Sequence, residues 1–432
     1  MPYVLGIDIG NTTTAAAVSR RRDTTWTRPE AVALGVGSVT VPSVLHLTAD
    51  GTFTVGEPGT GDGCRTARDF VRRVGDDVPL LLAGEACPPQ TLAAVLATWV
   101  VERTVDREGG PAQAVVISHP AGWGRYRRQL LHRALWELGL GDVTLLPRTV
   151  TVAESHAVRG FAGTRAAVYA LGGNTFEAAL VRRNPRGTYE TFGLPQALEC
   201  FGGVDFDEAL AEHVRSTLSR ELATAPRETD AALRGLLPEC DRAKRELTVA
   251  VETDVVLTLP TGPVRVPVSR VRFEDMIRPA VQATVDLLVR TVHSAGLTPE
   301  QLDGVLLAGG STRIPLIAEL LVGAFPVPVE VEPDPQLTAA TGAALAACQV
   351  VSPRPGRPEP AGEPHPDGEP VREPEAATGV ARVAAAVATP RRSARHRPLR
   401  SEPPPRPPVR FTPLELPKAS RLALARGRGR EG

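Results

Sequence analysis

Two stretches of this chain repeat one another, and the repeat limits what the chain can fold into. Residues 4–18 read VLGIDIGNTTTAAAV, and residues 167–181 read AVYALGGNTFEAALV. Each has an apolar run typical of a strand, then a glycine turn, then a second apolar run. A spacing of about 160 residues is too long for a solenoid and indicates two related lobes that each offer one turn to a shared ligand. The first copy carries Asp8 where the second has Ala170.

Four glycine-bearing stretches predict a nucleotide-binding cleft. They are DIGNTTT at 8–14, LGGNTFE at 171–177, FGGVDFD at 201–207 and LAGGSTRIP at 307–315. Glycine lets backbone amides approach phosphate oxygens closely, threonine hydroxyls add donors, and a nearby carboxylate can hold a hydrated divalent cation. Any one of these turns could serve chain geometry alone, so the prediction rests on the set. The sequence contains no Walker motif GxxxxGK[ST].

Before residue 350, β-branched runs alternate with helical stretches, which is typical of α/β layers. The clearest helix is predicted at 273–295, because core-type residues recur there every three or four positions. We expect this stripe to face a core, and it consists of Phe273, Ile277, Ala280, Val281, Thr284, Leu288 and Val292.

Cysteine spacing and hydropathy argue against several classes of protein. The five cysteines are odd in number and far apart, so we predict neither a disulfide framework nor a metal-ligand set, and a reducing cytoplasm fits them. The N-terminus has no basic leader, and no apolar run approaches the ~20 residues of a membrane helix. We therefore expect a cytoplasmic protein without a membrane span.

Composition changes sharply near residue 351. Of the 82 residues from there on, 17 are proline, and apolar periodicity is lost. We predict that 351–432 is disordered, because it cannot bury enough apolar surface to offset its ordering entropy. Residues 389–432 hold twelve basic and three acidic residues, a net charge of +9. This predicts a protein or polyanion partner for the basic, proline-rich tail.

The motifs resemble those of the Hsp70 chaperones. GIDIGNTTT is similar to the first phosphate motif of their actin-like ATPase domain, AVYALGGNTFEAALV to the second, and LLAGGSTRIPLI with VEPDPQLTAATGAALAA to the adenosine motif. The resemblance runs from about residue 3 to 349. It implies an α/β, actin-like ATPase fold of the Hsp70 nucleotide-binding type over 1–350, with lobe I at about 1–163 and lobe II at about 164–350 around a nucleotide cleft.

The resemblance also implies a site for ATP or ADP. Asp241, Lys244 and Thr248 would clasp the ribose and base from one face of a single helix, and Arg313 would stack on adenine. Lys244 is the only lysine before residue 418. The phosphates would be held by Thr12, Thr13, Gly172, Gly173 and Gly203, the base pocket would be lined by Gly309 and Gly310, and further nucleotide-binding positions are Gly10, Thr175, Gly202, Ser311 and Asp334.

The catalytic positions depart from the family pattern. The second cation-organising aspartate falls on Ala170, the third glycine on Asn174, and the threonine beside the attacking water on Asn11. The lysine near the γ-phosphate falls on Val71, and the glutamate after the third strand falls on Arg148 or Thr149. Asp8 remains as the candidate catalytic carboxylate. With Glu177, which stands in place of an aspartate, it would hold Mg²⁺ through water, and the losses imply that Mg²⁺ binding is weakened.

We therefore expect an adenine-nucleotide-binding, chaperone-related protein with weak or no hydrolysis, because phosphoryl transfer depends on positioned charge and metal. It would act as a nucleotide-responsive regulatory or scaffold module. We also expect no peptide-binding domain on this chain, since VVSPRPGRPEP follows where the family has a linker and a β-sandwich. A slow but genuine ATPase chaperone, a metabolite kinase of the same superfamily and a filament former remain as alternatives.

Overall fold

A computed structural model of the chain describes residues 1–56, 63–219, 233–259 and 262–352, all within one compact unit. The last helix runs to Val351, so the tail predicted to be disordered lies outside the described residues except for its first two positions. None of the helices in the described ranges is both long and apolar enough to cross a membrane.

The first sheet is built around β1 (Tyr3–Ile9), whose residues are buried along almost its whole length. β1 pairs antiparallel with β2 (Thr13–Arg22) and parallel with β11 (Val115–His119), which pairs parallel with β12 (Val143–Pro147). Strands buried on both faces read as near-continuous apolar runs, which is how β1 reads. Short strands pair with β2 at the other edge: β3 (Thr25–Trp26), β4 (Glu30–Ala31) and β5 (Thr40–Pro42).

The second sheet repeats this topology. β13 (Arg165–Leu171) pairs antiparallel with β14 (Phe176–Arg183) and parallel with β18 (Gly304–Ala308). β15 (Tyr189–Leu198) lies outside β14, and β19 (Val329–Glu330) lies parallel to β18. The pair Ile9–Thr14 brackets the first turn, and Leu171–Phe176 brackets the second. The sequence repeat is therefore a repeat of structure, with a four-residue hairpin turn in each copy.

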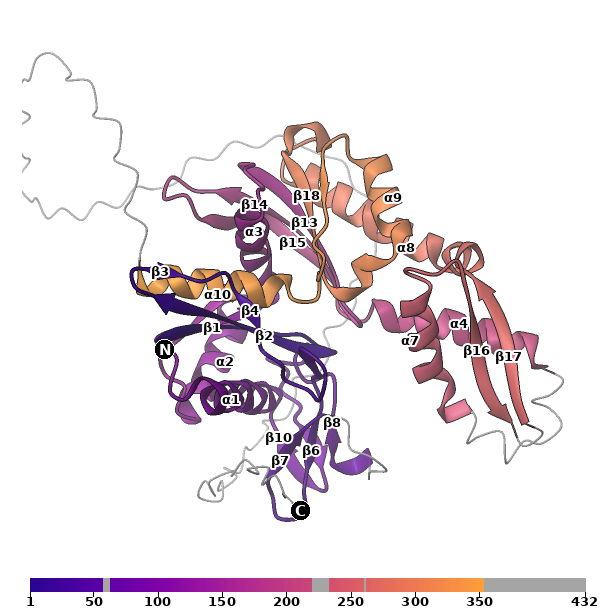
Figure 1. Ribbon diagram of the computed structural model, residues 1–432, viewed down its shortest axis with the longest axis horizontal. Helices are drawn as coiled ribbons and strands as arrows, with labels where there is room; N and C mark the ends of the chain where they lie inside the picture. Colours follow the sequence, from indigo (N-terminus) through magenta and orange to yellow (C-terminus); the bar gives the residue numbers. More distant parts are fainter. Residues whose placement is uncertain (57–62, 220–232, 260–261, 353–432) are drawn as a thin grey trace, which may run out of the picture. The chain divides into compact units, whose positions relative to one another are not determined.

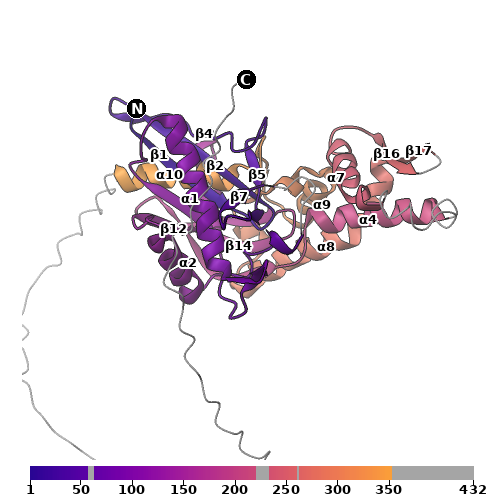
Figure 2. The same cartoon turned by 90° about the horizontal axis from the view of Figure 1, so that it is seen from below.

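Helices cover both faces of each sheet (Figures 1 and 2). On the first sheet, α1 (Pro89–Glu108) and α2 (Arg125–Glu137) lie opposite α10 (Thr338–Val351). On the second sheet, α3 (Arg148–Val158) lies opposite α8 (Arg270–Ser294), beside which α9 (Pro315–Ala324) packs. The helix predicted at 273–295 is confirmed as α8, which begins after its N-cap Ser269. Its predicted stripe faces the core, where only Ala280 is partly exposed.

Smaller elements extend the two sheets. Beyond the second sheet, α4 (Gly203–Thr217) packs on α7 (Leu236–Glu246), and α7 packs on a hairpin of β16 (Glu252–Leu259) and β17 (Gly262–Ser269). Between β5 and α1, three strands form one small sheet and two form another. These strands are β6 (Leu45–Leu47), β7 (Phe53–Val55), β8 (Thr66–Ala67), β9 (Leu80–Leu82) and β10 (Glu85–Cys87).

Helices α3 and α10 join the two sheets. α10 lies on β1, β2 and β11 of the first sheet, α3 lies on the strands of the second, and the two helices pack directly on each other. Glycines allow the close approach. A Cβ placed on Gly342 of α10 would lie 1.6 Å from the Thr151 carbonyl oxygen of α3, and one placed on Gly6 of β1 would lie 2.1 Å from the Ala344 nitrogen of α10. The helix pair therefore fixes how the two sheets meet.

We predict that Gly342→Ala destabilises the fold by about 3 kcal/mol or more, because backbone atoms cannot rotate away from the added methyl group. Gly323→Ala in α9 is the matched control, since a Cβ at that position meets nothing within 4 Å. Alanine there should be neutral or stabilising by about 0.5–1 kcal/mol. Chemical denaturation of both variants measures the difference, and equal stabilities would contradict the packing described for α3 and α10.

Candidate functional site

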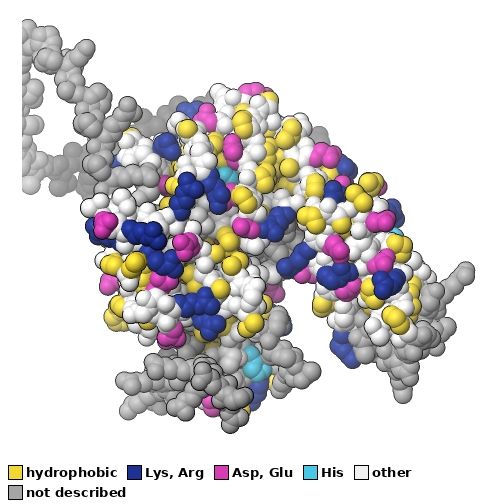
Figure 3. Space-filling model, viewed as in Figure 1, with side chains coloured by type: hydrophobic (Ala, Val, Ile, Leu, Met, Phe, Trp, Pro, Cys, Tyr) yellow, Lys and Arg dark blue, Asp and Glu magenta, His cyan; other side chains and the backbone are white. Residues whose placement is uncertain are grey.

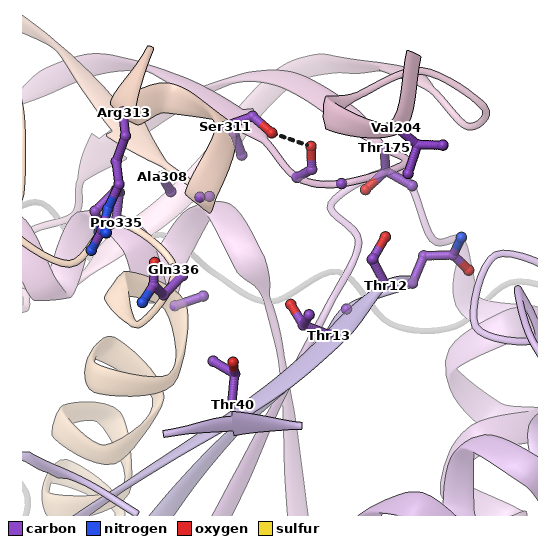
Figure 4. Close-up of a pocket in the computed structure, with 18 of the residues that line it drawn as sticks. Thr12, Thr13, Thr40, Thr175, Val204, Ala308, Ser311, Arg313, Pro335 and Gln336 are labelled. Atoms are coloured by element: carbon purple, nitrogen blue, oxygen red, sulfur yellow. Dashed lines mark hydrogen bonds between the residues drawn. The ribbon is translucent and has the colours of Figure 1, made fainter. Parts of the chain in front are cut away.

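A cavity of about 320 Å³ lies where the two hairpin turns meet. The first sheet contributes Thr12, Thr13 and Thr40 to its wall, and the second contributes the turn that carries Thr175. Arg313, Pro335 and Gln336 gather at one end, as Figure 4 shows. The cavity thus draws on segments from both halves of the chain, as the sequence repeat predicts for a shared ligand.

The two turns are built alike. The Gly10 amide donates to the Thr13 carbonyl at 3.0 Å, and the Gly172 amide donates to the Thr175 carbonyl at 2.9 Å. The turns also touch, since a Cβ on Gly173 would lie 2.7 Å from Thr12 Oγ1. Only glycine fits that contact, so the second turn depends on Gly173 to approach the first.

The N-terminus of α4 supports the second turn from behind. The Gly203 amide donates to the Gly172 carbonyl at 3.0 Å, and the Gly202 amide donates to Asp205 Oδ2 at 2.8 Å. Ser311 Oγ donates to the same Gly172 carbonyl at 2.8 Å, the bond drawn in Figure 4. The amides of Gly202 and Gly203 are thus already bonded and neither residue is among those that line the cavity, so their contact with a ligand stays a prediction.

Three charged side chains meet at the strand ends beneath the turns. Arg148, the first residue of α3, donates from Nε to Asp8 Oδ1 at 2.9 Å and from Nη1 to Glu177 Oε1 at 2.7 Å. The Arg148 side chain is 10% exposed, and all three residues line the cavity. We call them the Arg148 triad. Thr149, the other position considered for the family glutamate, instead bonds to Thr191 and is not among the lining residues.

Strand register explains where the carboxylates of the triad stand. Asp8 pairs with Ala15 across the first hairpin, and Ala170 pairs with Glu177 across the second. The second hairpin therefore carries its acid on the opposite strand from the first. Burial raises the pKa of the Glu177 carboxyl, although Arg148 opposes the shift. Burial alone would lower the pKa of Arg148, but Asp8 and Glu177 raise it above its ordinary value. The guanidinium is therefore a permanent cation.

Asparagines of the two turns bind one carboxylate. Asn11 Nδ2 donates to Asp69 Oδ1 at 2.6 Å, and Asn174 Nδ2 donates to the same oxygen at 3.0 Å. Asn11 lies in the first turn and Asn174 in the second, so Asp69 ties the turns together. We call these three residues the Asp69 clasp. Asp69 has φ 55°, a left-handed conformation that Asp and Asn tolerate better than most residues.

Val71 does not face the cavity. It is the position on which the family lysine falls, and it is 4% exposed within the core of the first sheet and not among the residues that line the cavity. The neighbouring Arg72 points elsewhere, with Nη1 at 3.1 Å from Cys200 Sγ.

The far end of the cavity is built around Lys244. Its Nζ donates to Asp207 Oδ2 at 2.8 Å and to the Gly203 carbonyl at 2.9 Å, and it lies 3.1 Å from Asp241 Oδ1. Burial raises the pKa of Asp207 to about 6 despite Lys244, whereas Lys244 and Arg245 together hold the pKa of Asp241 below its ordinary value against the effect of burial.

The prediction that one helical face carries Asp241, Lys244 and Thr248 is partly wrong. Helix α7 ends at Glu246, and Thr248 lies in the turn that follows, where its hydroxyl donates to the Arg245 carbonyl. All three residues still line the cavity, because the turn continues along the same side.

The opposite wall at this end follows β18. Gly309 has φ 90°, and a Cβ there would lie 2.2 Å from the Leu171 carbonyl oxygen, so only glycine fits. Gly310, Ser311 and Arg313 line the cavity. Asp334 does not. It accepts from Arg313 Nη2 at 2.7 Å and so orients the guanidinium, and its contact with a ligand stays a prediction.

The model of the family described as "Hsp70 protein" matches residues 71–357, more than half of the chain. This chain belongs to the Hsp70 family. Its fold is that of the Hsp70 nucleotide-binding domain, mixed α/β with two sheets flanking one cavity.

Curated relatives of this Hsp70-family chain carry the name "Chaperone protein DnaK". The protein of Elusimicrobium minutum is 27% identical over 358 residues, which are 80% of this chain and 58% of that protein. The protein of Thermotoga maritima is 26% identical over 361 residues, 80% of this chain and 59% of that protein. The match to Thermosipho melanesiensis has the same identity and coverage over 360 residues. The chain therefore spans less than two thirds of the length of these relatives.

Most of the predicted site residues of this Hsp70-family chain line the cavity, and the exceptions are Gly202, Gly203 and Asp334. Sequence reasoning gave no role to several lining residues, among them Asp207, Val204 and Gln336. Asp207 had a signal in FGGVDFD, since a carboxylate four positions after Gly203 in a helix returns to the same face. Asp69 had no such signal.

We predict that Asp69→Ala releases both turns of this Hsp70-family chain. Losing the acceptor shared by Asn11 and Asn174 should speed hydrogen exchange at residues 10–13 and 172–175 about fivefold, which corresponds to roughly 1 kcal/mol of lost hydrogen bonding. Asp76→Ala is the control, because that acid is exposed and pairs only with Arg73 among the contacts described for it. Exchange in the turns that is equally unaffected by both changes would rule out the clasp.

Proposed function

We propose that this chain binds ATP or ADP in the cavity and acts as a nucleotide-responsive regulatory or scaffold module with weak or no hydrolysis. One observation carries the proposal. A single cavity is bordered at one end by two glycine turns and the Arg148 triad, and at the other by Lys244 and Arg313. The distribution of donors and charge suits a ligand with a polyanionic end and a flat polar end.

The end that holds Lys244 suits adenosine. The Lys244 ammonium holds Asp207 and Asp241 in place, and the remaining lone pairs of these carboxylates can accept from ribose hydroxyls. The planar guanidinium of Arg313, held by Asp334, can stack on a base. At the other end, the hydroxyls of Thr12, Thr13 and Thr175 can donate to phosphate oxygens. These roles extend the residue-by-residue resemblance to the Hsp70 family.

Weak hydrolysis is inferred from the groups that this site lacks. Ala170 has no oxygen for a cation's water shell, and the Asn11 amide is committed to Asp69. A slow but genuine ATPase chaperone is the second candidate, and it is favoured by Asp8 and Glu177, which both line the cavity. A chaperone activity like that named for the longer DnaK relatives is part of this proposal for the chain.

The nucleotide response would run through α3 and α10. Arg148 at the start of α3 belongs to the cavity wall, and Ala339 at the start of α10 also lines it. A ligand that draws the two turns together would therefore act on the helix pair that joins the sheets. A conformational response requires that the ligand bind one arrangement of this helix pair more tightly than another.

The tail supports a further part of the proposal, a protein or polyanion partner. The whole chain has a formal net charge of zero, so the +9 of residues 389–432 is balanced by acidic residues elsewhere. On the face shown in Figure 3, acidic and basic side chains are interspersed, with no single-sign field there to hold the tail. A segment with this excess of basic residues would bind an extended polyanion in a salt-dependent way.

We predict that Lys244→Ala weakens ADP binding roughly 10- to 100-fold, because it removes charge-assisted hydrogen bonds. The control is Arg242→Ala on the same helix, whose guanidinium pairs with Glu239 and Glu246 and does not line the cavity. Calorimetric titration with ADP gives both affinities, and thermal unfolding checks that both variants fold. An unchanged affinity in the Lys244 variant would remove the adenosine end from the proposal.

We predict that phosphate release from ATP is at least roughly 100-fold slower than by the DnaK of Elusimicrobium minutum at the same temperature, since one missing positioned group typically costs that much in rate. The two proteins are compared under single-turnover conditions with excess magnesium. A rate within tenfold of the DnaK that disappears in Asp8→Asn would favour the slow ATPase instead.

A further inference from the structure

The Arg148 triad occupies the place where an Hsp70-type site would organise a divalent cation. Family resemblance assigns that task to Asp8, to the position of Ala170 and to Glu177. In the residues that the structure describes, no group of three or more His, Cys, Asp or Glu side chains could hold a metal ion. Whether Asp8 and Glu177 can hold a cation therefore depends on which of their oxygens are already hydrogen-bonded.

The donor set does not fit a cation. Asp8 Oδ1 accepts from Arg148 Nε and from the Ser118 hydroxyl, and Glu177 Oε1 accepts from Arg148 Nη1. The guanidinium thus already bridges the two carboxylates. A hydrated Mg²⁺ requires carboxylate oxygens that are free to bond to it or to its waters, in near-octahedral geometry. Here it would also have to approach a fixed positive charge.

Among the described residues that line the cavity, those near the triad offer no replacement acid. Ala170, paired with Glu177 across the hairpin, contributes a methyl group. The other carboxylates that line the cavity, Asp207 and Asp241, belong to its far end and are engaged by Lys244. The described lining residues therefore supply no carboxylate in place of the aspartate that the family pattern has at position 170.

Arg148 has donors to spare. A guanidinium carries five N–H groups, of which Nε, Nη1 and Nη2 use one each on Asp8, Glu177 and the Ile9 carbonyl. The other two make no hydrogen bond within the described ranges of the chain. Arg148 lines the cavity at the end bordered by the glycine turns. Its planar fork matches the spacing of phosphate oxygens.

We propose that Arg148 replaces the divalent cation, so that this chain takes the phosphates of its nucleotide without metal. This inference rests on the nucleotide site proposed above. The guanidinium neutralises charge that magnesium would otherwise neutralise, and Asp8 and Glu177 hold it in position. The ligand is then the free nucleotide polyanion, and its magnesium complex is the poorer ligand because the metal meets Arg148.

The test measures ADP affinity of the full chain by calorimetry, once with excess magnesium and once with EDTA. The expected affinity in EDTA equals or exceeds that in magnesium. ADP binding that is lost in EDTA and restored by magnesium overturns the inference and leaves the nucleotide site standing. No ADP binding under either condition overturns both.

A variant separates the guanidinium from the rest of the site. Arg148→Met should weaken binding in EDTA at least about tenfold, since it removes charge-assisted contacts to phosphate. It should also make binding magnesium-dependent, because Asp8 and Glu177 are released for a cation. Arg148→Lys, which keeps the charge, should retain binding in EDTA. Arg182→Met, at an exposed arginine of β14 paired with Glu190, is the control and should leave both affinities unchanged.

Equal ADP affinities in EDTA for the Met variant and the unchanged chain would show that Arg148 does not hold phosphate and would overturn the proposal. If the Met variant fails to fold, the ADP affinities of the Arg148→Lys variant and of the unchanged chain are compared in EDTA and in magnesium. Binding that depends on magnesium in either protein would contradict the proposal.

Discussion

The ion pairs that Arg148 makes with Asp8 and Glu177 connect the two halves of the molecule. Asp8 stands on β1 of the first sheet, Glu177 on β14 of the second, and Arg148 at the start of the helix that crosses between them. Removing one partner of a buried ion pair typically costs about 3–5 kcal/mol, because the remaining charge loses its compensation. The triad therefore holds the cavity floor together while contributing charge to the cavity.

The close packing of α3 on α10 complements the triad. Gly342 lets the backbones of α3 and α10 approach so closely that no side chain fits between them at that point. The Asp69 clasp adds a second tie at the turns. A ligand in the cavity would touch the turns, which the Asp69 clasp joins, and the starts of α3 and α10, which pack on each other. These linked contacts are the physical basis of the proposed nucleotide response.

Much of this arrangement follows from local sequence. The two hairpins, the α8 stripe and most of the cavity lining could be predicted because strand periodicity, glycine turns and helix periodicity are encoded within a few residues of each other. The two hairpins are alike for the same reason, since the repeat in sequence spans both, whereas the parallel neighbours β11 and β18 lie outside the repeat.

The interactions that set the chemistry could not be read in the same way. Arg148 and Asp8 are 140 positions apart, and Asn174 and Asp69 are 105 apart, so only the folded chain brings them together. A pattern showed that the family acids were missing, but not that a guanidinium had taken the space between those that remain. The helical placement of Thr248 was wrong because the residue at which a helix ends depends on tertiary packing.

Anomalous scattering from crystals grown with ADP and excess Mn²⁺ would show directly whether a metal ion or Arg148 lies between Asp8 and Glu177. ADP should lie in the cavity with Arg148 in contact with phosphate oxygens, and no manganese signal should appear between Asp8 and Glu177. A manganese ion coordinated by either carboxylate, with Arg148 displaced from them, would contradict the proposal.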